Sequence, residues 1–126
     1  FGLSGGLSAD MREIAAAAEG GNAQAATAID AFCYQIKKHI GAFAAALGGL
    51  DAVAFTGGIG QRSALVRQKA LEGLGFLGIH LDAAINADSP QDSLISAPDA
   101  AVRVYIVATN EEIVIARKAR ELLEEK

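Results

Sequence analysis

The fold of this chain is decided by the stretch Ala52-Val-Ala-Phe-Thr-Gly-Gly-Ile-Gly-Gln-Arg-Ser63. Its first five residues are mostly apolar and have the length of a buried β-strand. Glycines follow at positions 57, 58 and 60, and a helical pattern then runs from about Ser63 to Leu74. Glycine lets the backbone approach a ligand closely, and the start of a helix offers free N–H groups. The stretch therefore predicts a strand, a ligand-binding turn and a helix.

The composition limits the class of protein. The 126 residues carry a net charge of −4, which argues against nonspecific binding of nucleic acid, because such binding needs a basic face. No apolar run reaches the ~18–20 residues of a membrane span. The single cysteine, Cys33, excludes an internal disulfide and fits a reducing compartment. We expect a cytoplasmic α/β protein. Because the chain opens at Phe1 within a glycine-rich phrase, we also expect it to be part of a longer polypeptide.

Two helices are expected before the first strand. Asp10 with Glu13 three residues later indicates a capping box, so Asp10 is the expected N-cap of a short helix. A long helix follows over residues 22–47, with Cys33 buried beside its apolar stripe. The stripe consists of Ala25, Ile29, Phe32, Ile36, Ile40, Phe43 and Leu47. We expect this stripe to pack on a sheet.

The second half of the chain supplies another strong strand. Residues 101–108 are rich in β-branched side chains. Residues 77–81 indicate a short strand with His80 exposed, and residues 82–99 indicate a loop with a brief strand at 94–96. A last helix runs to the C-terminus with an apolar stripe of Ile115, Ala116, Ala119, Leu122 and Leu123. Strands separated by helices predict an α/β fold with parallel neighbours.

Two candidate sites lie at the starts of expected helices, one at residues 10–12 and one at residues 57–62. Asp10-Met-Arg12 begins a helix, and the simplest interpretation is an N-cap followed by a surface arginine. The segment 57–62 lacks the Gly-Lys-Ser/Thr of a phosphate loop, and Ser63 stands where a dinucleotide fingerprint needs its third glycine. Asp82 is the one acid placed to bind a ribose. A tight strand-to-helix turn is the simpler alternative.

A third candidate site is Thr109-Asn-Glu-Glu112 at the end of the second strand. With Thr109 as N-cap, Glu112 occupies the third helical position and completes a capping box. Glu111 then has no structural duty beyond the helix dipole. A free carboxylate at the end of a core strand can bind Mg²⁺, directly or through water, and a solvated glutamate is the equal alternative.

Taken together, these phrases resemble the C-terminal lobe of the acetate and propionate kinase family. The resemblance runs through 4–13, 51–60, 73–79 and 109–112, in the order of the family's motifs, and covers nearly the whole chain. It implies a ribonuclease-H-like lobe of the actin-like, sugar-kinase ATPase superfamily, with a mixed sheet and flanking helices. It also implies transfer of the γ-phosphoryl group of ATP to acetate with Mg²⁺, giving acetyl phosphate and ADP, in a homodimeric enzyme.

The resemblance assigns roles to particular residues. Asp10, Met11 and Arg12 would line the adenosine pocket, and Glu111 matches the family's Mg²⁺-associated glutamate. The adenine-side loop would consist of Gly58, Ile59, Gly60, Gln61 and Arg62. Gln61-Arg62 departs from the family's usual Glu-Asn, so Arg62 either contacts the nucleotide through its charge or turns to solvent.

The resemblance places the acyl pocket, the catalytic arginines and a histidine before Phe1. Of the arginines that remain, namely Arg12, Arg62, Arg67 and Arg103, we expect most to lie at the surface, so the chain alone should show no kinase turnover. Two alternatives belong to other classes. One is an NAD(P)-binding reductase domain, suggested by Val53-Ala-Phe-Thr-Gly-Gly58, and the other is a non-catalytic assembly domain built on the alanine-rich long helix.

Overall fold

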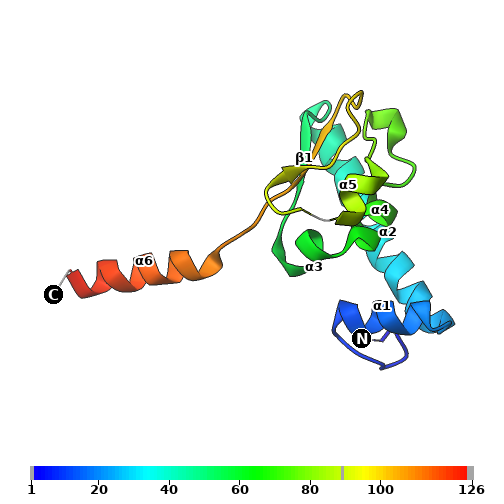
Figure 1. Cartoon of the computed structure of the whole chain (residues 1–126), viewed down its shortest axis with the longest axis horizontal. Helices are drawn as coiled ribbons and strands as arrows, with labels where there is room; N and C mark the ends of the chain where they lie inside the picture. The colour runs from blue at the N-terminus through cyan, green and yellow to red at the C-terminus, as the bar shows by residue number, and fades with distance from the viewer. Residues whose placement is uncertain (1, 89, 125–126) are drawn as a thin grey trace.

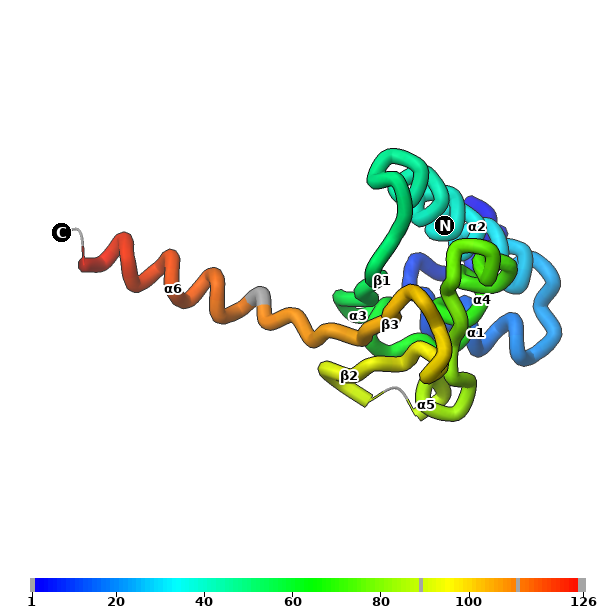
Figure 2. The backbone as a smooth tube through the Cα atoms, turned by 90° about the horizontal axis from the view of Figure 1, so that it is seen from above, coloured from blue at the N-terminus to red at the C-terminus, as the bar shows by residue number. Residues whose placement is uncertain are grey.

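The computed structural model describes residues 2–88 and 90–124, apart from the side chain of Glu111. Helices α2 and α4 pack beside a small sheet, α1 packs against α2, and α6 extends away from this body (Figures 1 and 2). The helices are α1 (Met11–Glu19), α2 (Ala23–Leu47), α3 (Gly57–Arg62), α4 (Ala64–Leu71), the 3₁₀ turn η1 (Gly75–Leu77), α5 (Ala83–Asp88) and α6 (Glu111–Glu124). The strands are β1 (Ala52–Phe55), β2 (Ser93–Leu94) and β3 (Arg103–Ile106).

The sheet is mixed and has the strand order β1-β3-β2. Strands β1 and β3 run parallel, with register from Ala52 opposite Arg103 to Phe55 opposite Ile106. Strand β2 pairs with β3 in the antiparallel sense. The α/β fold with parallel neighbours is therefore confirmed, and so is each of the two strong strands. Because β1 and β3 are parallel, their carboxyl ends meet at one edge of the sheet.

The long helix is confirmed over 25 residues, with Asn22 as its N-cap and Gly48 in the left-handed region after its end. The predicted stripe is correct only in part. Ala25 and Ile29 are buried, but Phe43 is 62% and Leu47 73% exposed. The buried line instead steps by four residues through Cys33 and reaches Ala44. Periodicity located the helix, whereas its partner α4 selects which side is buried.

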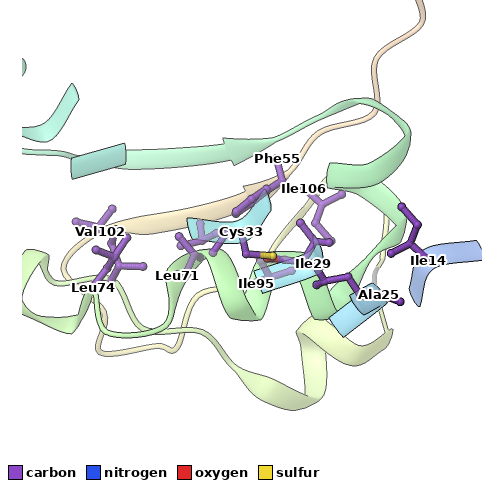
Figure 3. Close-up of a cluster of buried hydrophobic side chains, with 14 residues drawn as sticks. Ile14, Ala25, Ile29, Cys33, Phe55, Leu71, Leu74, Ile95, Val102 and Ile106 are labelled. Atoms are coloured by element: carbon purple, nitrogen blue, oxygen red, sulfur yellow. The ribbon is translucent and has the colours of Figure 1, made fainter. Parts of the chain in front are cut away.

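The hydrophobic core lies between α2, α4 and the inner face of the sheet. Cys33 sits at its centre with Ile29, Leu71 and Ile95 around it (Figure 3). Its Sγ lies 3.8 Å from the carbonyl oxygen of Val66, and burial raises the pKa of the thiol. Cys33 is thus a buried apolar side chain, as expected.

The glycine-rich segment departs from the expected turn, because Gly57–Arg62 forms the six-residue helix α3. Gly57 has φ of +70°, which lets the chain leave β1 and enter this helix at once. Ser63 then caps α4 by accepting a hydrogen bond from the Val66 N–H at 3.3 Å. Two short helices at an angle therefore replace the turn and the single helix.

The region from 77 to 99 also differs from expectation. Residues 77–81 contribute only single bridges, Ile79 with Val102 and Leu81 with Ser96. His80 is exposed, as predicted. The expected loop contains helix α5, capped by Asp82, whose Oδ1 accepts from the N–H groups of residues 84 and 85 at 2.9 and 3.0 Å. Asp82 therefore has a structural role as the cap of α5.

The C-terminal helix is confirmed, but its cap and its packing are not as predicted. Asn110, rather than Thr109, supplies the cap, since its Oδ1 accepts from the Ile113 N–H at 3.1 Å. Glu112 is therefore the second helical residue and makes no capping box. The stripe that includes Leu122 is exposed, because α6 leaves the body (Figure 1). Within the described residues, no helix has both the length and the apolar character needed to cross a membrane.

Candidate functional site

A pocket of about 450 Å³ lies between the first turn of α1 and helix α3. It is lined by Asp10, Met11, Arg12, Ala15, Gly58, Ile59, Arg62 and Ser63. We call it the α1–α3 pocket. The structure thus brings together two predicted segments that are far apart in the sequence. The pocket sits beyond the carboxyl end of β1, the usual position of ligand sites in open α/β sheets.

Two of the predicted residues do not line this pocket. Gly60 faces β1, and a Cβ added there would lie 3.3 Å from the carbonyl carbon of Phe55. The Gln61 side chain turns toward Thr109 instead. Both residues therefore support α3 from the side of the sheet, while Gly58, Ile59 and Arg62 form the pocket wall.

Asp10 and Arg12 form a fork-shaped ion pair at the rim of the pocket. The Oδ1 of Asp10 accepts from the Arg12 N–H at 2.9 Å and from its Nε at 3.1 Å, and the Oδ2 lies 2.5 Å from Nη2. The N-cap interpretation is confirmed. The hydrogen bond from the Arg12 side chain lowers the pKa of Asp10 to about 2, and the same contact raises the pKa of Arg12. Both groups are therefore charged at neutral pH.

This ion pair contributes little to folding, because the Arg12 side chain is 82% exposed. Its effect is to hold the guanidinium in one orientation beside the pocket. Arg62 lines the same pocket and brings a second positive charge. With one carboxylate against two guanidinium groups, the lining has an excess of positive charge, which suits an anionic ligand.

Helix α3 is held from inside the body by Arg67, one of the four arginines of which we expected most to lie at the surface. Arg67 is 0% exposed. Its Nη1 donates to the carbonyl oxygens of Gly60 at 2.8 Å and Gln61 at 3.0 Å. Its Nε and Nη2 donate to the side-chain and backbone oxygens of Asn86 at 2.7 and 2.9 Å. Burial lowers the pKa of Arg67.

The sequence contained a signal for this burial. Arg67 stands on the face of α4 that also carries Ser63, Ala70 and Leu71, at spacings of three and four residues. An arginine on the apolar side of a helix must satisfy its donors internally. Asn86 supplies two acceptors, and its own Nδ2 donates to the Ala64 carbonyl oxygen at 3.1 Å. The network thus joins α3, α4 and α5.

The third predicted site lies where β3 ends. Glu111 is the first residue of α6, and its side chain lies outside the described part of the structure. Among the side chains that the structure describes, there is no group of three or more His, Cys, Asp or Glu residues suited to hold a metal ion.

A wider hollow of about 600 Å³ lies beside α4 and α5, with Lys69, Glu72 and His80 among its lining residues. None of the predicted site residues lines this hollow. The α1–α3 pocket is therefore the stronger candidate, since it joins two motifs and has a defined place beyond a core strand.

An α/β fold with a pocket beyond the carboxyl end of a parallel strand has the usual arrangement of a small-molecule site in α/β proteins. The model of the Acetokinase family matches residues 1–117. The chain belongs to this family.

Individual relatives agree with the family match. The chain is 46% identical over 118 residues to the acetate kinase of Pseudothermotoga lettingae, which covers 94% of this chain and 29% of that protein. The crystal structure of acetate kinase from Porphyromonas gingivalis matches with a TM-score of 0.86 and 40% identity, over 97% of this chain and 31% of that one. A propionate kinase structure from Francisella tularensis matches with a TM-score of 0.76 and 34% identity, over 85% and 27%. The chain therefore spans under a third of the length of these relatives.

Proposed function

We propose that this chain forms the adenosine-binding part of an ATP:acetate phosphotransferase, which makes acetyl phosphate and ADP. The observation that carries the proposal is the α1–α3 pocket, which joins Asp10, Met11 and Arg12 to Gly58 and Ile59. The names of the related proteins support the reaction. The propionate kinase among the similar structures supports propionate as the alternative acceptor.

The pocket has the size and chemistry for the nucleoside end of ATP. Its volume of about 450 Å³ lies within the range of small-molecule sites, ~300–1,000 Å³. Met11 and Ile59 offer apolar surface for a purine ring. Gly58 has no Cβ, and the space that a Cβ would occupy is open. A ring can therefore approach the backbone of α3 at this point. Arg12 and Arg62 provide positive charge toward the phosphates.

The roles of Gly60 and Gln61 in this proposal are indirect. Both belong to the proposed adenine-side loop, and both support α3 rather than line the pocket. We therefore propose that the cofactor contacts are made by Asp10, Met11, Arg12, Gly58, Ile59 and Arg62. Gly60 and Gln61 keep the wall in place.

Mg²⁺ is proposed to bind near Glu111, at the end of β3. Mg²⁺ commonly uses one or two carboxylates together with substrate phosphates and water. Glu111 fits the role of that carboxylate, with phosphate oxygens and water as the other ligands. When bound, the ion would neutralise the charge that develops on the phosphoryl oxygens.

The remaining parts of the proposal concern the larger protein. We propose that the fold is one ribonuclease-H-like lobe of a two-lobed, homodimeric, cytoplasmic kinase. The acceptor carboxylate would bind to residues outside this chain, so the chain alone would have no kinase turnover. Phosphoryl transfer depends on positioning and charge stabilisation, and the arginines described here serve the nucleotide or the fold.

Calorimetric titration of the chain with Mg-ADP, Mg-ATP and NAD tests the proposal. Adenine nucleotides should bind and NAD should not. Ile59→Glu should weaken ADP binding at least about tenfold, because a carboxylate in the pocket repels the phosphates and occupies apolar space. Ile85→Glu is the matched control, since Ile59 and Ile85 are 40% and 39% exposed. Preferred binding of NAD would support the reductase alternative. If none of Mg-ADP, Mg-ATP and NAD binds, the result would support the assembly domain.

A further inference from the structure

Two loops leave the sheet at the same edge and then take separate directions. The ladder between β1 and β3 ends where the Val107 N–H donates to the Phe55 carbonyl oxygen at 2.9 Å. Beyond this bond, β1 continues into α3, which walls the α1–α3 pocket. Strand β3 continues through 107–110 into α6, which begins at Glu111. The proposed adenosine and metal halves of the site therefore lie on different loops.

Gln61 bridges these loops, although it is 48 positions from Thr109 in the sequence. With its oxygen turned inward, its amide accepts from the Gly57 N–H at 3.0 Å and from the Thr109 N–H at 3.2 Å. In the opposite orientation its nitrogen would lie 3.3 Å from the Thr109 Oγ1. We favour the first orientation, because it satisfies two backbone donors with one oxygen. We call these two hydrogen bonds the Gln61 clasp.

The Gly57 end of the clasp gives a partner to a backbone N–H that the helix itself leaves without an acceptor. Gly57 is the first residue of α3, so its N–H has no acceptor within the helix. Thr56, the N-cap residue, makes no side-chain cap bond. The side-chain oxygen of Gln61, one turn further along the same helix, accepts the hydrogen bond from this N–H. The clasp therefore fixes the start of α3 as well as its contact with the other loop.

The Thr109 end completes a series of anchors along the second loop. The Val107 N–H bonds to Phe55, and the Ala108 N–H donates to the Asp92 Oδ1 at 2.8 Å. The Thr109 N–H reaches Gln61, and Asn110 caps α6. Each successive residue is thus fixed by a different part of the chain. Of these anchors, only the Gln61 clasp connects the loop to the pocket wall.

We infer that Gln61 is a positioning residue that couples the adenosine pocket to the metal-side loop carrying Glu111. The inference rests on the proposed function. Gly58 and Ile59 lie three and two residues before Gln61 in α3, and Glu111 lies two residues after Thr109. A ligand that fixes α3 therefore favours the loop arrangement that presents Glu111, and a metal bound at Glu111 favours the arranged pocket. By linkage, each ligand strengthens binding of the other by the same factor.

The first experiment measures the clasp itself. Residue-resolved amide exchange on the chain compares wild type with Gln61→Met, which keeps the length of the side chain and removes the acceptor. The amides of Gly57 and Thr109 should exchange about threefold to tenfold faster in the variant, as expected for the loss of one hydrogen bond. Gln68→Met on the exposed side of α4 is the control and should leave both amides unchanged. Equal exchange in wild type and Gln61→Met overturns the clasp.

The second experiment measures the coupling. ADP affinity is determined calorimetrically with and without Mg²⁺, and the ratio of the two affinities is compared between variants. Gln61→Met should reduce this ratio about threefold or more, because the ratio reports the coupling between the two ligands separately from any change in metal-free ADP affinity. Gln61→Glu retains an acceptor and should retain the ratio. An unchanged ratio in Gln61→Met overturns the positioning role.

The two experiments distinguish failure of the Gln61 positioning role from failure of the proposed adenosine-binding function. If unmodified chain binds no ADP, the proposed function fails and the positioning role fails with it, whereas amide exchange still decides whether the clasp exists. If ADP binds and Mg²⁺ strengthens its binding, the ratio in Gln61→Met decides the positioning role alone.

Discussion

The Nε of Arg67 donates a 2.7 Å hydrogen bond to the Oδ1 of Asn86 in the interior of the chain. Its Nη1 donates to the carbonyl oxygens of Gly60 and Gln61 in α3, and its Nη2 donates to the backbone oxygen of Asn86. A helix that contains three glycines in six residues has low intrinsic stability, at a cost of ~1 kcal/mol per glycine relative to alanine. Arg67 therefore supplies from the core what the α3 sequence lacks, and the pocket wall depends on a residue that does not line the pocket.

Arg67→Met should lower the free energy of unfolding by about 3 kcal/mol, because it leaves buried carbonyl and amide oxygens without their charged donor. Urea denaturation measures this change. Arg103→Met is the control, since Arg103 is exposed on the outer face of β3, and it should change stability by less than ~0.5 kcal/mol. Equal losses in the two variants would contradict the role given to Arg67. Arg67→Lys should lose less than Arg67→Met, since one ammonium replaces part of the guanidinium fork.

Gly58 and Gly60 should respond differently to alanine. A Cβ at Gly58 meets open space, whereas one at Gly60 lies 3.3 Å from the carbonyl carbon and 3.4 Å from the Cβ of Phe55. Gly60→Ala must push α3 away from β1 and should be about 1 kcal/mol less stable than Gly58→Ala. Gly58→Ala should instead weaken ADP binding, since its methyl group enters the pocket. Denaturation and calorimetry on the same two variants check both effects, and an identical profile for the two would contradict this division.

Asp10 should titrate well below an ordinary aspartate. The side-chain hydrogen bond from Arg12 lowers its pKa to about 2. Because the pKa in the folded chain is lowered, the stabilising contribution of the carboxylate is complete above its ordinary pKa of ~3.9 and is lost as pH falls through about 2. NMR titration of the Asp10 carboxyl should give this midpoint.

Arg12→Gln should move the Asp10 midpoint part of the way back toward ~3.9, since the backbone hydrogen bond from residue 12 remains. Arg62→Gln removes the other arginine of the pocket and should leave the midpoint in place. An equal shift in both variants would show that the net charge of the pocket, rather than the Asp10–Arg12 hydrogen bonds, sets the pKa.

The sequence predicted features that depend on local interactions. Asp10 was identified as a cap by the glutamate three residues after it, and the long helix was identified by its apolar spacing. The strands beginning at Ala52 and near Arg103 were clear from their β-branched and apolar runs. The resemblance named Asp10-Met-Arg12 and the α3 loop as two walls of one site, and residues of both segments line one pocket. That this pocket binds adenosine stays a prediction.

The features that sequence missed depend on contacts between distant segments. Helix α3 was expected to be a turn, because its glycines disfavour a helix and Arg67, which holds it, comes from α4. Phe43 was placed in the core because it fits the period, yet α2 turns Cys33 and Ala44 inward instead. Thr109 was the expected cap, but its N–H bonds to Gln61 of α3, and the next residue, Asn110, caps α6. Local sequence spacing does not distinguish Phe43 from Ala44, or Thr109 from Asn110.

The apolar side chains of α6 should be neutral to the stability of this chain. Leu122 and Leu123 are 65% and 73% exposed, and the helix extends away from the body (Figure 2). Leu122→Glu should therefore leave the urea midpoint of unfolding unchanged within ~0.5 kcal/mol. Ile29→Ala is the reference for a packed position, since Ile29 is 2% exposed, and should cost about 2–5 kcal/mol through lost burial and a residual cavity. A loss for Leu122→Glu that approaches the Ile29→Ala value would mean that α6 folds back onto the outer face of the sheet, beside Tyr105, in solution.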